Sequence, residues 1–186
     1  MDGSHMREQL EEIHQASYGW AMSCCSRDQS EAEVVLQTVY LKILEGKARF
    51  DGKSSFKTWL FSVIRRTAAD RRRRKILSRL RLVGYGSNTD EISSAERPDE
   101  TIYRSQLQEI FGRALADLPA RQREVLQLVF YHDFTIAGAA EVMGVSLGAA
   151  RTHYERGKAR LRRWMEESKV VHESGFGRKQ NQEIIP

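Results

Sequence analysis

The sequence from residue 135 to residue 164 reads TIAGAAEVMGVSLGAARTHYERGKARLRRW and predicts two helices separated by a tight turn. Thr135 and Ser146 are of the types that cap helix N-termini, because their hydroxyl groups accept hydrogen bonds from free backbone N–H groups. Gly144 suits the turn, since glycine adopts a positive φ without strain. We expect the first helix to end near Met143 and the second to run to about Trp164.

The second predicted helix has an apolar face and a basic face. Its inner stripe comprises Leu147, Ala150, Tyr154, Gly157, Leu161 and Trp164. Its outer face comprises Gly148, Thr152, Glu155, Arg156, Ala159 and Arg163, with Arg151 and Arg162 on the flank. A short helix, a glycine turn and a basic second helix are typical of a DNA-reading helix-turn-helix. The alternative is an ordinary helical hairpin with a solvated charged face.

A second basic element lies in residues 60–82, which hold nine bases and one acid. It continues an amphipathic helix whose predicted core stripe is Phe56, Trp59, Leu60, Val63, Ile64, Thr67 and Ala68. The opposite face carries Thr58, Ser62, Arg65, Ala69 and Arg72. Aromatic rings among bases suit single-stranded nucleic acid, which stacks on the rings and places phosphates along the cations. We expect Phe61 and the loop residues Asp51, Lys53 and Ser54 to be free to touch an unstacked base. The alternative for the basic run at residues 71–75 is that it is only a solvated helix end.

Charge alternates along the chain, with acidic blocks at residues 7–45 and 87–110 and basic blocks at residues 60–82 and 146–164. The net charge is only +5, so the distribution carries more information than the sum, and it indicates two contacts with a polyanion. The segment 84–99 is polar and reads as a linker. We predict a cloning remnant at 1–6, domains at 7–83 and 100–168, and a flexible tail at 169–186.

Composition favours an all-α fold of two small helical domains, because the chain of 186 residues has only three prolines and many helix-forming residues. Apolar runs are short and no signal segment opens the chain, so we expect no transmembrane helix and a cytoplasmic protein. No catalytic set or phosphate-binding loop is visible, which predicts a protein that is not an enzyme and uses no cofactor or metal. Adjacent Cys24 and Cys25 are expected to be free thiols, and His132 and His153 to be surface or half-buried residues.

Two sets of residues resemble the extracytoplasmic-function (ECF) sigma factors of bacterial RNA polymerase, over about residues 10–165. The set that resembles region 2 is Ala32-Glu33, Gln37, Tyr40-Leu41, Phe50, Phe56-Lys57-Thr58-Trp59-Leu60 and Asp70-Arg71-Arg72-Arg73. The set that resembles region 4 is Leu118-Pro119, Arg123-Glu124-Val125-Leu126, Thr135, Ala140, Met143-Gly144-Val145-Ser146, Gly148 and Lys158-Ala159-Arg160. The two sets stand in the family's order and are separated by a linker.

The resemblance implies a protein that binds the beta-prime and beta subunits of core RNA polymerase, melts the −10 element of a promoter and reads the −35 element. The implied −10 contacts are Phe50, Asp51, Lys53, Ser54, Trp59, Arg65, Arg66, Arg72 and Arg73. The implied −35 contacts are Ser146, Arg151, Thr152, His153, Arg156, Lys158 and Arg162. The implied polymerase-docking residues are Glu33, Gln37, Tyr40 and Leu41. An anti-sigma factor, often held at the membrane, is a further implied partner.

The sequence departs from the family pattern at five positions. Val34 and Thr38 stand where members usually carry Asp and Glu, Arg66 where they carry Asn, Asp133 where they carry Gly, and Gly138 where they carry Glu. Glycine inside a short helix costs roughly 1 kcal/mol relative to alanine. We interpret the chain as a divergent member. The other hypotheses are a stand-alone helix-turn-helix regulator, whose N-terminal half senses a ligand or dimerises, and a sigma mimic that only binds an anti-sigma protein.

Overall fold

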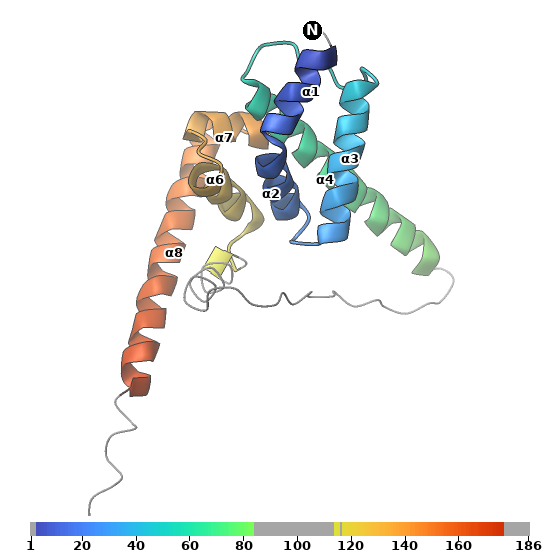
Figure 1. Ribbon diagram of the computed structural model, residues 1–186. Helices are drawn as coiled ribbons and strands as arrows, with labels where there is room; N and C mark the ends of the chain where they lie inside the picture. Colours follow the sequence, from blue (N-terminus) through green and yellow to red (C-terminus); the bar gives the residue numbers. More distant parts are fainter. Residues whose placement is uncertain (1–2, 84–113, 116, 177–186) are drawn as a thin grey trace, which may run out of the picture.

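The computed structural model describes residues 3–83, 114–115 and 117–176, and within these residues all regular structure is helical (Figure 1). The helices are α1 (Gly3–Glu12), α2 (His14–Cys24), α3 (Gln29–Leu44), α4 (Phe56–Val83), α6 (Ala120–Tyr131), α7 (Ile136–Met143) and α8 (Leu147–Phe176). The all-α prediction is therefore confirmed. The predicted linker at 84–99 lies outside the described residues. Among the helices that the structure describes, none has both the length and the apolar character needed to cross a bilayer.

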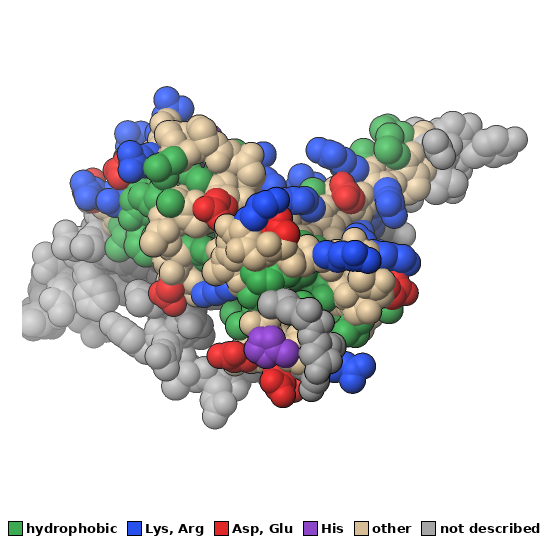
Figure 2. All heavy atoms as spheres, turned by 90° about the horizontal axis from the view of Figure 1, so that it is seen from above, with side chains coloured by type: hydrophobic (Ala, Val, Ile, Leu, Met, Phe, Trp, Pro, Cys, Tyr) green, Lys and Arg blue, Asp and Glu red, His purple; other side chains and the backbone are tan. Residues whose placement is uncertain are grey.

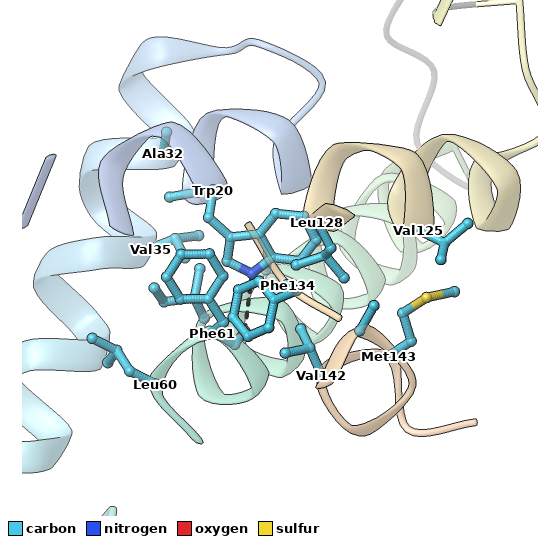
Figure 3. Packing of buried hydrophobic residues seen from close by; sticks show 14 of the residues in the cluster. Trp20, Ala32, Val35, Leu60, Phe61, Val125, Leu128, Phe134, Val142 and Met143 are labelled. Atoms are coloured by element: carbon cyan, nitrogen blue, oxygen red, sulfur yellow. Dashed lines mark hydrogen bonds between the residues drawn. The ribbon is translucent and has the colours of Figure 1, made fainter. Parts of the chain in front are cut away.

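The N-terminal half is a bundle in which α4 packs on α2 and α3. Helix α3 starts at an Asp28 cap, whose side chain accepts a hydrogen bond of 3.0 Å from the Glu31 N–H. The side chains that α3 buries recur at helical spacing and are Ala32, Val35, Leu36, Val39 and Ile43. From α2, Trp20 is 1% exposed and its Nε1 donates a 3.0 Å hydrogen bond to the Phe61 carbonyl of α4 (Figure 3). This bond satisfies the polar atom of a buried indole.

The helix-turn-helix forms as the local sequence predicts. The Thr135 side chain accepts a hydrogen bond of 3.0 Å from the Gly138 N–H, and Gly144 adopts φ 64° at the end of α7. The Ser146 hydroxyl accepts a hydrogen bond of 3.2 Å from the Ala149 N–H. These three residues fix the ends of α7 and the start of α8.

Helix α8 differs from the prediction at both ends. Leu147 is 39% exposed, because it lies before the first full turn, so the buried stripe begins at Ala150 and not at Leu147. The helix continues to Phe176 rather than ending near Trp164, and residues 169–176 of the predicted tail are helical. The sequence contains no glycine or proline from 165 to 174, so nothing breaks the helix there. The rest of the predicted tail, 177–186, lies outside the described residues.

The two halves of the chain pack directly on each other. Helix α7 contacts α4, and Figure 3 shows Trp20 of α2, Phe61 of α4, Leu128 of α6 and Phe134 in one cluster. The first half of α4 is therefore buried on both faces. Phe61 is completely buried, so the prediction that its ring is free for a nucleic-acid base is wrong in this structure. Periodicity alone did not show that a second helical unit covers the polar face.

Candidate nucleic-acid interface

The loop between α3 and α4 is anchored by aromatic rings. The half-buried Phe50 ring lies 5.6 Å from the Phe56 ring and 5.4 Å from the Trp59 ring, measured between centroids. Exposed Asp51 and Lys53 form an ion pair of 2.9 Å, and hydrogen bonding to Lys53 lowers the pKa of the Asp51 carboxyl. The loop thus presents polar groups to solvent beside a patch of partly exposed rings. This arrangement brings together the predicted −10 residues of the loop and Trp59.

The basic residues of α4 divide into paired and exposed groups. Arg71 and Lys75 bind the Glu31 carboxylate at 3.3 and 3.1 Å, and the Lys75 hydrogen bond is the main cause that lowers the Glu31 pKa. Three predicted contact residues are exposed along the same helix: Arg66, Arg72 and Arg73. Figure 2 shows blue side chains along the projecting end of α4, at the right of the view. This end of α4 therefore offers cations to a phosphate chain.

Arg65 does not join the exposed group. Its Nε pairs with the Glu124 carboxylate of α6, and the two side chains are only 21% and 16% exposed. Arg121 also holds Glu124, at 3.1 Å. The structure therefore places the predicted −10 residue Arg65 in a contact between the two halves, away from solvent. Its partner Glu124 belongs to the C-terminal half, so the sequence around Arg65 alone does not predict this ion pair.

The start of α8 exposes most of the predicted −35 residues. The side chains of Arg151, Thr152, Arg156 and Arg162 are exposed, and those of His153 and Lys158 are half-buried. The Lys158 Nζ lies 5.1 Å from the centroid of the Tyr154 ring, which in turn stacks on Phe130. A helix of this kind can insert its N-terminal turns into a major groove while later arginines bind phosphates. The predicted DNA-facing surface is thus assembled on one helix.

The predicted docking residues lie on an exposed side of α3. Glu33, Gln37 and Leu41 are exposed at successive four-residue steps, and Leu41 is 57% exposed. Tyr40 is half-buried, with its hydroxyl 3.1 Å from Nδ1 of His14. The departure Val34 adds apolar surface to this side. Exposed apolar groups within a polar rim are typical of protein-binding surfaces.

Within the part of the chain that the structure describes, the cysteines and His132 do not form a reactive centre. Burial raises the pKa of the Cys24 thiol well above its ordinary value, and the pKa of Cys25 to about 11. Both cysteines are free, as predicted, and neither is a ready nucleophile at neutral pH. His132 is buried, which corrects the prediction of a surface or half-buried residue. Within the described ranges, no three His, Cys, Asp or Glu side chains gather as a metal site.

The sequence matches two family models, Sigma-70 region 2 over residues 10–76 and Sigma-70, region 4 over residues 108–161. It is 32% identical over 143 residues to the ECF RNA polymerase sigma factor SigX of Bacillus subtilis, which covers 75% of this chain and 73% of SigX. The chain belongs to the ECF sigma factors of the sigma-70 family. As a sigma factor it directs transcription initiation, which agrees with the prediction that it is not an enzyme.

Further relatives and structural neighbours of this sigma factor support the assignment to the family. RNA polymerase sigma factor YlaC of Bacillus subtilis is 23% identical over 166 residues, which cover 88% of this chain and 95% of YlaC. The fold is similar to that of the sigma factor RpoE from Bartonella quintana, solved with the anti-sigma factor NepR, with a TM-score of 0.67 and 23% identity over 87% of this chain and 97% of that chain. CnrH, solved with the cytosolic domain of CnrY, gives a TM-score of 0.62 and 18% identity over 89% of this chain and 90% of CnrH.

Two departures from the family pattern have a structural explanation. Asp133 adopts φ 55°, in the left-handed region. The family's usual glycine adopts this conformation without strain, and Asp is among the residues that tolerate it best after glycine. At Gly138, an added Cβ would lie 3.0 Å from Cδ1 of Phe134, so the glycine leaves room for that ring. The Thr38 hydroxyl donates to the Val34 carbonyl at 2.6 Å. Nothing in the structure explains Arg66.

Proposed function

We propose that this sigma factor binds core RNA polymerase and gives it promoter specificity through two DNA contacts of different chemistry. One contact is the aromatic-anchored loop and basic α4, and the other is the exposed basic start of α8. Region 2 is assigned to residues 7–83, region 4 to residues 100–168, and the connection to residues 84–99. The observation that carries the proposal is the capped helix-turn-helix with Arg151, Thr152 and Arg156 exposed on one helix.

The −10 element is bound as parted strands. Rings such as Trp59 offer a stacking surface, the loop residues Asp51, Lys53 and Ser54 offer polar contacts, and the arginines of α4 line up with the phosphates. The paired residue Arg65 becomes available only when Glu124 moves away. The set assigned to this contact remains Phe50, Asp51, Lys53, Ser54, Trp59, Arg65, Arg66, Arg72 and Arg73.

The −35 element is bound as a duplex. Arg151, Thr152 and Arg156 face the major groove, with His153 beside them, and Lys158 and Arg162 bind phosphates. Ser146 acts mainly through its cap on α8 and contacts the backbone of the DNA there. Arg162→Ala is expected to lower the slope of log affinity against log salt by about one, because one phosphate contact is lost.

Two protein contacts complete the proposal. The exposed side of α3 with Glu33, Gln37 and Leu41, and half-buried Tyr40 at its edge, docks on the polymerase. The complexes of RpoE with NepR and of CnrH with CnrY support an anti-sigma factor as a second partner. In this proposal the active protein works on nucleoid DNA, and the anti-sigma factor holds it away from polymerase, in some members at the membrane.

Transcription in vitro with core polymerase over a promoter library tests the function. A defined start site that requires both this chain and core enzyme is the expected result. Gel-shift assays separate the main alternative, because a stand-alone regulator would bind duplex promoter DNA equally well without polymerase. Docking is tested with Leu41→Glu, which should weaken binding to core, whereas Glu45→Gln at the exposed end of α3 serves as a surface control. Failure to bind core or to start RNA at any defined site would refute the proposal.

A further inference from the structure

The first turn of α3 carries a carboxylate that binds two cations of α4. The Oε2 of Glu31 accepts a 3.3 Å hydrogen bond from Nε of Arg71, and its Oε1 accepts one of 3.1 Å from Nζ of Lys75. Arg71 and Lys75 are four residues apart, so both lie on the side of α4 that faces α3. The Glu31 N–H donates to the side chain of the Asp28 cap, which fixes the backbone from which this carboxylate extends. A single acid at a fixed helix start therefore binds two cations of the basic run.

This cluster lies where α4 leaves the helical bundle. Ala68 is the last buried residue in the described part of α4, and every side chain from residue 72 to residue 80 is exposed. The side chains of Glu31, Arg71 and Lys75 are 27%, 36% and 51% exposed. Because they are partly in water, Arg71 and Lys75 can turn toward a phosphate chain without disturbing the core. Their pairing with Glu31 therefore bears directly on whether DNA can use them.

The predicted phosphate contacts of α4 lie on other sides of the helix. Successive residues of an α-helix are rotated by about 100°, so Arg73 lies roughly 160–200° from Arg71 and Lys75 around the helix axis. Arg66 is seven residues before Arg73, which places both on the side opposite the Glu31 cluster. Arg66 and Arg73 are exposed, and so is Arg72 between the two sides. The basic run thus has one side bound by a carboxylate and another side open to solvent.

The number of cations that bind phosphate controls how strongly DNA affinity depends on salt. Each phosphate that a protein neutralises contributes about 0.7 to the slope of log affinity against log salt for single strands. A cation that is already bound to a carboxylate must lose that partner before it binds phosphate. Hydrogen bonding to Lys75 lowers the Glu31 pKa, so this carboxylate is ionised at neutral pH. Partly exposed ion pairs add little to stability, so we expect the cluster to act on DNA binding more than on folding.

We propose that Glu31 is a positioning residue that keeps Arg71 and Lys75 from binding DNA phosphates. The phosphate contacts of α4 then come from the exposed arginines on its other sides, and a bound strand follows those sides. The inference rests on the proposed function, because it determines which cations make the −10 contact. One acid outside α4 thereby limits the sequence-independent attraction that five consecutive cations at residues 71–75 would otherwise exert.

Two double variants with the same change in charge test which cations bind phosphate. The full chain is titrated onto a fluorescein-labelled oligothymidylate of about 12 nucleotides between about 50 and 200 mM salt, since phosphate contacts need no particular sequence. Arg72→Ala with Arg73→Ala should lower the salt slope by about 1.4, because two phosphate contacts are lost. Arg71→Ala with Lys75→Ala should leave the slope within about 0.5 of the wild-type value. Equal losses in the two double variants would overturn the inference.

Removal of the carboxylate is expected to have the opposite effect. Glu31→Gln should raise the slope by about 0.7–1.4, because one or both released cations bind phosphate. Over an about fourfold range of salt, the ratio of variant to wild-type affinity then changes by about threefold to sevenfold. In the background of Arg71→Ala with Lys75→Ala, Glu31→Gln should cause no such rise. A wild-type slope in Glu31→Gln, or the same rise with and without the two cations, would contradict the positioning role.

Asp70→Asn is the matched control for charge. It removes one negative charge from an exposed position on α4 itself, and its effect on the slope should be less than half of that of Glu31→Gln. An equal rise in both variants would show that general charge, and not the release of two cations, is responsible. The comparison of the two double variants leaves Glu31 unchanged, so it decides the inference even if far-UV circular dichroism shows that Glu31→Gln folds poorly.

The same assays separate this inference from the proposed function. A wild-type chain that does not bind the oligothymidylate would remove the phosphate contact of α4 from the proposed function, and the inference with it. A wild-type chain that binds the oligothymidylate but starts no RNA at any defined site with core polymerase would remove the proposed function. The slopes of the variants would then still decide whether Glu31 keeps two cations of α4 from phosphate.

Discussion

Acidification should destabilise this protein through one buried histidine. The His132 ring lies edge-on against Trp20 and Phe61, which stack on each other. Burial lowers the pKa of His132 from 6.5 to about 4, with the nearby Lys57 ammonium adding to the shift and Asp133 opposing it. The folded protein therefore keeps the ring neutral where an exposed ring would take up a proton. Between pH 6.5 and pH 4 the unfolded chain binds more protons than the folded one, so stability falls as the pH falls.

The size of the effect follows from the two pKa values. With about 4 in the folded state and 6.5 in the unfolded state, the loss of unfolding free energy relative to pH 8 is about 2 kcal/mol at pH 5 and about 3 kcal/mol at pH 4. The Glu31 carboxyl acts in a lower pH range. The lowered pKa of Glu31 means that its contribution is present above about pH 4.5 and is lost as the pH falls through its lower folded pKa. The interval from pH 8 to pH 5 thus lies above the range in which the contribution of Glu31 is lost.

Urea unfolding of the wild type and of His132→Phe at pH 8 and pH 5 measures the difference. Phenylalanine keeps an aromatic ring in the site but cannot be protonated, so the wild type should lose about 2 kcal/mol more than the variant on acidification. The other four histidines are common to both proteins and cancel in the comparison. His153→Phe retains His132 and should keep the wild-type pH dependence. Equal pH dependence in the wild type and His132→Phe would refute the reasoning.

Three further predictions follow from single side chains. Gly157→Ala should destabilise the protein by about 1–3 kcal/mol in urea unfolding, because the added Cβ would lie 2.9 Å from Cδ1 of buried Leu126. Gly148 has open space around it, so the control Gly148→Ala should be neutral or stabilising by up to about 1 kcal/mol. Asp133→Val should cost about 1–2 kcal/mol in thermal unfolding, since a β-branched residue is strained at φ 55°. Arg151→Ala should cost on the order of 1–3 kcal/mol at one −35 position in competition binding of holoenzyme to promoter variants, and unchanged base preference would contradict its reading role.

The helix-turn-helix was predictable because its signals are local. Thr135, Gly144 and Ser146 act on backbone groups within four residues, so their effect depends little on the rest of the chain. The exposed outer face of α8 followed from the same periodicity. The end of α8 was less predictable, because weak helix-ending signals are overridden when no glycine or proline interrupts the chain.

The contact between the halves was not predictable from periodicity. The polar residues Thr58 and Ser62 indicate a solvent-facing side of α4, and only a segment 70 or so positions away covers them. The pairing of Arg65 with Glu124 spans 59 residues and leaves no local signal in either helix. A run of bases looks the same whether its members meet phosphates or carboxylates. The sequence therefore predicted which residue types make up the candidate −10 surface. It did not predict which of these side chains are exposed and which are paired with carboxylates.

The departures from the family pattern near residue 135 concern this contact more than DNA reading. Asp133 reverses the chain at φ 55° between His132 and Phe134, whose rings both pack on Phe61. Gly138 leaves the space that Phe134 occupies. A larger side chain at 138 would push Phe134 toward α4 or out of the contact, while the DNA-facing start of α8 lies beyond Gly144. Substitutions at these two positions should therefore weaken the packing between the two halves before they change the choice of promoter sequence.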